Sequence, residues 1–180
     1  MHAASMSIAI LCSALWASGL CAAERAVWVP HEYTFQYTGF TTTYSCDGLA
    51  DKLEHLLILS GAHADAKANP GSCSAGFGRP DKFANAKLHF RTLASADVPG
   101  AIGEIKHGHW RAVSVAAQRP MPLQSGDCEL VEQFRDQVLK EMFTIRKLED
   151  NTRCVPHQAS GSIDLRFEVF VPRVPAPATP

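Results

Sequence analysis

The sequence predicts an α+β fold: two βαββ repeats that form a mostly antiparallel sheet with two helices packed on it, each repeat stapled by one disulfide. Two segments carry this prediction, because each runs from a cysteine through a helix-like stretch to a second cysteine, from Cys46 to Cys73 and from Cys128 to Cys154. Strand-like alternation of apolar residues flanks both segments. The chain therefore repeats one unit of helix and strands, over about residues 31–94 and about residues 108–171.

The N-terminus, residues 1–23, has the pattern of a secretory signal peptide. The apolar run MSIAILCSALWASGLCAA precedes the first charged residue, Glu24, and ends in small residues. Such a run is typical of the h-region and cleavage region of a signal peptide, so we expect cleavage after Ala23. A membrane anchor is the alternative interpretation. The favoured interpretation is a periplasmic or secreted protein with no stable membrane anchor.

The first repeat opens with EYTFQYTGF, in which apolar residues alternate as in a strand with one buried face, namely Tyr33, Phe35 and Tyr37. Helical spacing then places four leucines on one face, namely Leu49, Leu53, Leu56 and Leu57. Gly61 is a suitable residue to end this helix. The alternation of HADAKAN predicts a strand over His63–Asn69, and KLHFRTL predicts another.

The second repeat has the same order of expected elements. HWRAVSVAA alternates like a strand, and a helical face follows, made of Val131, Phe134, Val138 and Met142. FTIRKLE at Phe143–Glu149 is the expected returning strand. In SIDLRFEVFV every second residue is apolar, namely Ile163, Leu165, Phe167, Val169 and Val171, which is the clearest strand pattern in the chain.

The mature chain keeps four cysteines, and an even number in an exported protein indicates disulfides. A strand that runs back over a helix returns to the level at which the helix began. We therefore predict the pairs Cys46–Cys73 and Cys128–Cys154, whose separations in sequence are 27 and 26 residues. Residues 24–171 are expected to form a single domain, and the proline-rich residues 172–180 an extended tail.

The string GFTTTYSCDGLADKL, from Gly39 to Leu53, resembles small exported proteobacterial proteins of unknown function. This resemblance is local and implies no activity, cofactor or catalytic residue. The doubled βαββ order is similar to that of the SOUL and GyrI-like folds, which bind small ligands between their two halves. That similarity concerns the fold and assigns no function.

TTTYS lies just before the first expected helix and makes Thr42, Thr43 and Ser45 candidates for binding an anion or a sugar. Capping of the helix by Ser45 or Asp47 explains the same residues without a ligand and is the favoured interpretation. His107 and His109 are candidates for a metal site, because residues two apart on a strand share a face. No cysteine or carboxylate completes that site, with Glu104 the nearest acid, so the sequence predicts no metal.

Charge and motifs narrow the function without identifying it. With 17 basic and 18 acidic residues, nothing indicates binding to nucleic acid. No cofactor motif and no catalytic residue stands out. We therefore expect an exported, disulfide-stapled binding or interaction module, with an unknown protein or small molecule as its partner in the periplasm. The alternative is a periplasmic, hydrolase-like enzyme whose site is dispersed over several loops.

Overall fold

The computed structural model describes residues 24–72, 79–96, 104–117 and 123–173. The first half of the chain contains one helix and three strands, β1 (Glu24–Thr38), α1 (Cys46–Leu59), β2 (Lys67–Pro70) and β3 (Phe83–Ser95). The second half contains β4 (Lys106–Ala116), the short 3-10 turn η1 (Ser125–Asp127), a helix in three parts, and the strands β5 (Ile145–Asp150), β6 (Arg153–Val155), β7 (Gln158–Ser162) and β8 (Asp164–Pro172). The helix comprises α2 (Cys128–Phe134), the π-turn η2 (Arg135–Leu139) and α3 (Lys140–Met142).

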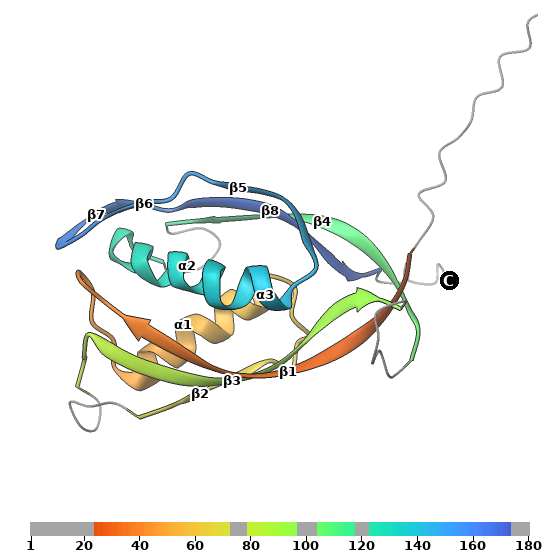
Figure 1. Cartoon of the computed structure of the whole chain (residues 1–180), viewed down its shortest axis with the longest axis horizontal. Helices are drawn as coiled ribbons and strands as arrows, with labels where there is room; N and C mark the ends of the chain where they lie inside the picture. Colours follow the sequence, from red (N-terminus) through yellow and green to blue (C-terminus); the bar gives the residue numbers. More distant parts are fainter. Residues whose placement is uncertain (1–23, 73–78, 97–103, 118–122, 174–180) are drawn as a thin grey trace, which may run out of the picture.

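Six of the strands form one antiparallel sheet in the order β2-β3-β1-β4-β8-β5, and β6 and β7 form a separate hairpin. The middle of this sheet is narrow, because β1 meets β4 only where Glu24–Ala26 pairs with Lys106–Gly108. Beyond that junction the sheet opens into two layers, β2-β3-β1 and β4-β8-β5, and both helices lie between them (Figure 1). The predicted α+β class, the antiparallel sheet and the two helices are confirmed.

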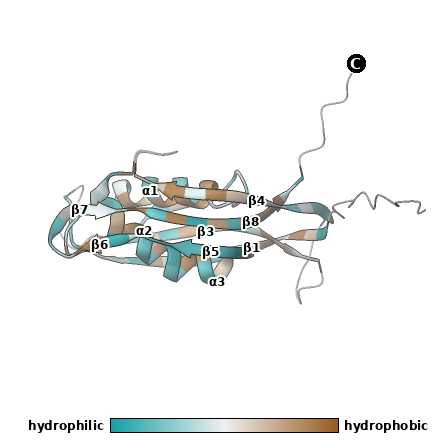
Figure 2. Ribbon diagram, turned by 90° about the horizontal axis from the view of Figure 1, so that it is seen from above, coloured by the Kyte–Doolittle hydropathy of each residue, from teal (hydrophilic) through white to brown (hydrophobic). Residues whose placement is uncertain are grey.

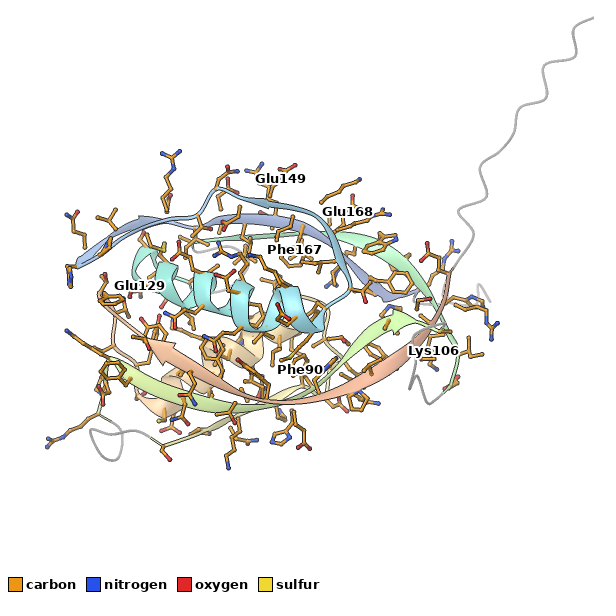
Figure 3. The ribbon with its side chains drawn as sticks, in the orientation of Figure 1. Phe90, Lys106, Glu129, Glu149, Phe167 and Glu168 are labelled. Atoms are coloured by element: carbon orange, nitrogen blue, oxygen red, sulfur yellow. A yellow bond between two sulfur atoms is a disulfide. The ribbon has the colours of Figure 1, made fainter. Side chains whose placement is uncertain are left out.

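The core lies between the two layers. The apolar faces predicted for the strands point into it, and Phe90 and Phe167 face the helices from opposite layers (Figure 3). Glu149 and Glu168 lie on the outer face of the β4-β8-β5 layer (Figure 3). The clearest predicted strand corresponds to β8 and the residue before it, and all five of its expected inward residues are buried, namely Ile163, Leu165, Phe167, Val169 and Val171.

A second, smaller apolar cluster lies at the narrow junction of the sheet. Ala26, Leu93 and Phe170 are buried there, and the rings of Trp110 and Phe170 lie 5.3 Å apart. Gly108 allows this packing, because a Cβ at Gly108 would lie 2.0 Å from the Cζ atom of Phe170. A glycine within a strand often marks such a close approach. The junction therefore depends on the absence of a side chain at Gly108.

Helix α1 follows its predicted pattern from start to end. The side chain of Ser45 accepts a hydrogen bond from the Gly48 N–H at 3.1 Å, as an N-cap does. The predicted leucine face, Leu49, Leu53, Leu56 and Leu57, is completely buried. The chain leaves the helix at Gly61, whose φ of 95° is in the left-handed region. In Figure 2, which shows the molecule from above, α1 lies beside β4.

The strand expected over His63–Asn69 is shorter than predicted. Only Lys67–Pro70 pairs with β3, and the Ala66 N–H bonds back to the His63 carbonyl in a turn. Alanine has little strand propensity, so the alternating alanines do not extend the ladder. The sequence also did not predict the β6–β7 hairpin, which occupies the expected loop before β8.

The Cys128–Cys154 disulfide is confirmed, with a Cα–Cα distance of 5.5 Å. It joins the N-terminus of α2 to strand β6, as the geometry of a helix and a returning strand requires. Cys46 does not carry a free thiol. Cys73 lies outside the described residues, so the Cys46–Cys73 pair stays a prediction. Among the described residues, no helix has the length and apolar character needed to cross a membrane.

An acid-sensitive ion-pair cluster lies on the exposed side of the second helix. Hydrogen bonds from Arg135 and Lys140 hold the pKa of Asp136 at about 2, below its usual value. Because this pKa is lowered by folding, its stabilising effect is present above about pH 4 and is lost as the pH falls toward 2. Asp136 is half exposed, so solvent screening limits the effect to about 1 kcal/mol or less.

We expect Asp136→Asn to lower the free energy of unfolding near neutral pH and to have little effect near pH 2. Urea denaturation of both proteins across this pH range measures the difference. A difference that stays constant down to about pH 2 would contradict the ion-pair explanation.

Candidate functional site

A groove runs along the edge of β4, between that strand and the C-terminal turn of α1. Its volume is about 490 Å³, and its lining consists of Ile58, Leu59, Arg111, Ala112, Val113, Ser114 and Ala116. Ile58 is a large apolar residue with 41% of its surface exposed. The groove therefore combines an apolar floor with one cationic side chain and an edge of the sheet.

The backbone of β4 alternates between two directions. In an antiparallel ladder the N–H and C=O of one residue point to the same neighbouring strand, and those of the next residue point to the other side. The His107 carbonyl accepts from the Arg173 N–H at 2.7 Å, on the side of β8. The odd-numbered residues of β4 therefore bond toward β8. Trp110, Ala112 and Ser114 turn their backbone groups away from it.

Beyond the junction at Gly108, none of the described strands pairs with these outward groups. Within the described part of the chain, no hydrogen bond joins the outward N–H and C=O of Trp110, Ala112 or Ser114 to another residue. Such a row of unpaired donors and acceptors is a template for another strand. The groove is thus bounded by an open hydrogen-bonding edge.

The C-terminal part of the corresponding edge of β1, at Gln36 and Thr38, is covered by two glutamine side chains. Gln137 bonds both backbone groups of Gln36, accepting from its N–H at 3.1 Å and donating to its carbonyl at 2.8 Å. Gln133 bonds Thr38 in the same way, at 3.0 and 2.8 Å. Residues four apart on a helix lie on one face, so Gln133 and Gln137 both face β1. Their side-chain amides form the hydrogen bonds that the backbone of a neighbouring strand would otherwise form.

The outer edges of the sheet are also protected. On β2, the outward N–H of Ala68 bonds Glu54 at 3.3 Å, and Pro70 has no N–H to offer. On β5, a bulge with Lys147 at a φ of 51° interrupts the ladder. Bulges, prolines and covering side chains are the usual ways to prevent an edge from pairing. Among the described residues, the edge of β4 beyond Gly108 shows none of these features.

We expect the double variant Gln133→Ala, Gln137→Ala to expose the β1 edge. Loss of these hydrogen bonds at a solvent-accessible edge should lower the free energy of unfolding by about 1–2 kcal/mol. The variant should also self-associate more than the wild type, as measured by sedimentation. Glu141→Ala, an exposed change on the same helix, is the control and should have neither effect. A monomeric double variant would show that the glutamines do not protect the edge.

Arg111 lies where the edge and the helix end meet. Its guanidinium donates to the Leu59 carbonyl at 3.1 Å, at the C-terminus of α1, where a cation is favourable. No ion pair joins Arg111 to a carboxylate of the described residues. The positive charge that Arg111 brings to the groove is therefore bonded to an uncharged group, the Leu59 carbonyl. Trp110, next to it on the outer face, has the Arg146 guanidinium 4.2 Å from its ring centroid.

The residues predicted before α1 make contacts within the protein. Thr42 donates to the Gly126 carbonyl at 2.6 Å, and Ser45 caps the helix. Thr43 is exposed. These contacts favour the capping interpretation, and the structure does not bring Thr42, Thr43 and Ser45 together with the β4 groove.

Two carboxylates, which the sequence did not single out, organise the loop that contains these residues. Glu129, on α2, accepts hydrogen bonds from the Phe40 N–H at 3.0 Å and from the Thr41 N–H at 3.1 Å. Asp127 binds the Lys52 ammonium at 2.7 Å and the Tyr44 hydroxyl. The contacts are satisfied internally, so this buried network has the character of a structural support.

Two tyrosines belong to the same network. Burial, with the neighbouring Glu129 carboxylate, raises the pKa of Tyr37 well above its usual value. Burial and the hydrogen bond to Asp127 raise the pKa of Tyr44 likewise. Both phenols therefore remain protonated donors at physiological pH. Neither is poised to act as a base.

His107 and His109 are both exposed on β4, on one face as predicted from their spacing. Glu104, the nearest acid, pairs instead with Lys106 at 2.6 Å. Among the described residues, no group of three or more potential ligands is arranged to hold a metal ion. The two histidines do not reach the groove lining.

His63, Asp65 and Arg91 form an ion-pair cluster on the surface. The His63 Nδ1 lies 2.6 Å from Asp65 Oδ1 and 2.8 Å from an Arg91 nitrogen. The Arg91 hydrogen bond lowers the pKa of Asp65. Ser60 is close in sequence, but its Oγ is buried without a hydrogen-bond partner in the described structure.

Comparison of the chain with protein-family profiles, with characterised proteins and with solved structures finds no match. The function of the groove is therefore inferred from its geometry.

Proposed function

We propose that the chain is an exported binding module that takes an extended polypeptide segment as an added strand on β4. The open edge of β4 carries this proposal. Strand addition gives affinity through main-chain hydrogen bonds and specificity through pockets for alternate side chains. In this proposal the main-chain hydrogen bonds come from the outward N–H and C=O groups of Trp110, Ala112 and Ser114. The pocket for ligand side chains is the groove beside Ile58.

The contrast between the two halves supports an edge kept open for binding. Within the six-stranded sheet both halves have the order strand, helix, strand, strand, and the β6–β7 hairpin is an addition to the second half. We interpret the halves as two copies of one βαββ unit, each with its own disulfide. Gln133 and Gln137 follow Cys128 by five and nine residues, and Asp51 and His55 follow Cys46 by the same intervals. In this interpretation the glutamines that close the β1 edge have no amide counterparts on α1. Of the two equivalent edges, as far as the structure describes them, only that of β1 carries such a cover, at Gln36 and Thr38.

The proposed location follows from the N-terminal signal-like run and from the disulfide. Disulfides persist in oxidising compartments, such as the periplasm or the exterior of the cell. Extended segments of other proteins, from unstructured tails to unpaired strands, are accessible to a binding module there. We place the protein in the periplasm or outside the cell on these grounds.

The proposal is tested with variants that remove a single outward N–H. Proline at an edge position whose N–H faces solvent is compatible with the sheet, but it cannot donate to an added strand. Ala112→Pro and Ser114→Pro should therefore fold and lose peptide binding, while Ser114→Ala keeps the N–H and should bind like the wild type. Peptides selected from a random display library on the wild type are the probe, and titration measures their affinity.

Each outcome of this experiment decides the proposal. A loss of at least about tenfold in affinity for both proline variants, with thermal transitions retained, is the expected result. Equal binding by the wild type and the proline variants would place the peptides elsewhere and overturn the proposal. Failure to select any peptide on the wild type would overturn it as well.

A further inference from the structure

We infer that the added strand runs antiparallel to β4 and presents an apolar residue followed, two positions later, by an acidic residue. This inference rests on the proposed function and specifies its ligand. The apolar side chain lies opposite Val113, and the acidic side chain lies opposite Arg111. The residue between them faces outward and is not selected.

The two specifying positions follow from the ladder geometry. Ala112 turns its N–H and C=O outward, so the residue opposite it in an antiparallel partner forms a hydrogen-bonded pair. Residues opposite Arg111 and Val113 then form pairs without hydrogen bonds, in which the side chains approach more closely. Val113 points into the protein, and the Arg111 guanidinium reaches the end of α1. Both therefore face the groove side of an added strand.

The position opposite Val113 favours an apolar side chain. Val113 itself is 7% exposed, and Ile58 and Leu59 form the facing wall. Ile58 keeps 41% of its surface exposed in the unbound protein. An aliphatic side chain placed there removes this surface from water, which is favourable. A charged side chain at the same point would lose hydration without gaining a partner.

The position opposite Arg111 favours a carboxylate. The guanidinium has a planar fork of donors that suits a carboxylate, and the Leu59 carbonyl occupies only part of it. Among the described residues no carboxylate forms an ion pair with Arg111. A lysine in the ligand would meet the positive charge at short range instead. The ligand thus supplies the charge that the protein leaves unbalanced.

The order of the two residues follows from chain direction. β4 already pairs antiparallel with both β1 and β8, and antiparallel pairing is slightly the more stable kind. A strand running opposite to β4 reaches Val113 before Arg111. The intervening residue lies over Ala112, beside a shallow depression on the outer face that also touches Lys147 and Glu168. Because the depression is lined by both a basic and an acidic side chain, it favours neither a positive nor a negative ligand residue at this position.

Matched synthetic peptides test this inference. They share a threonine-rich extended background and differ in a central Val-Thr-Glu, Val-Thr-Lys or Glu-Thr-Val. We expect Val-Thr-Glu to bind the wild type about three- to tenfold more tightly than either of the others. Arg111→Glu should reverse the preference between Glu and Lys. Lys87→Glu, an exposed change of the same charge on β3, should leave the ranking as in the wild type.

The outcomes separate the inference from the function on which it rests. If the three peptides bind equally and the proline variants block them, strand addition stands and the specificity is wrong. If the ranking survives in folded Arg111→Glu, Arg111 does not read the acidic residue and the inference is overturned. If none binds and the wild type sediments as a dimer that Ala112→Pro makes monomeric, a second copy occupies the edge and both are overturned.

Discussion

Replacing both Cys128 and Cys154 with alanine should lower the free energy of unfolding by about 2–4 kcal/mol. The bond closes a loop of 26 residues, for which the chain-entropy estimate is about 3.5 kcal/mol. It also joins the start of α2 to the β6–β7 hairpin, whose pairing consists of a few residues. A short hairpin is marginal by itself, so its order depends on this link.

Urea denaturation of the double variant, without reductant, measures the effect. Cys128→Ala alone should cost at least as much, because it leaves the thiol of Cys154 free to react. Ser125→Ala, in the turn just before α2, is a control that should change stability by less than about 0.5 kcal/mol. A double variant as stable as the wild type would show that the loop is already ordered by other contacts.

The isosteric change Glu129→Gln should cost about 2–3 kcal/mol, because it removes a charged acceptor from a buried site. Glu129 is 8% exposed, and one of its oxygens accepts from two backbone N–H groups, those of Phe40 and Thr41. The glutamine side chain would present either its NH2 group, which cannot accept from these backbone N–H groups, or its uncharged oxygen, which accepts more weakly than a carboxylate. The loop between β1 and α1 then loses its attachment to the second helix.

The change in the chemical denaturation midpoint of Glu129→Gln tests this expectation. Glu141→Gln, exposed on the same helix, should change stability by less than about 0.5 kcal/mol. A Glu129→Gln protein of wild-type stability would mean that water replaces the carboxylate contacts. Binding at β4 should persist in the folded fraction, because Glu129 does not line the groove.

Patterns local in sequence predicted much of this fold. Alternation identified β8, leucine spacing identified the buried face of α1, and the cysteine spacing identified the Cys128–Cys154 bond. Each of these three features depends on interactions within one element, or between a helix and the strand that follows it in the chain. Their physical causes, burial of one face and chain reversal, are visible in a short segment.

The candidate site depends on contacts between distant segments, so the sequence could not predict it. HWRAVSVAA indicated a strand, but nothing in those letters shows that β1 diverges after Gly108 and leaves the edge open. Nothing in the sequence around Gln133 and Gln137 shows that their side chains bond a strand about 100 residues away. Glu129 likewise looks in the sequence like an ordinary residue near a helix start. Its hydrogen bonds go to Phe40 and Thr41, which are too distant in sequence for this role to be predicted.

Amide exchange on the folded, full-length protein tests the central claim most directly. The backbone N–H groups of Ala112 and Ser114 point outward and should exchange rapidly in the unbound protein, whereas those of Val113 and Val115, bonded toward β8, should be protected. Addition of a saturating Val-Thr-Glu peptide should slow exchange at Ala112 and Ser114 by at least about tenfold and leave the outward N–H of Thr34 on β1 unchanged. Unchanged exchange at Ala112 and Ser114 in the bound protein, or protection that appears only on other elements, would contradict strand addition at β4.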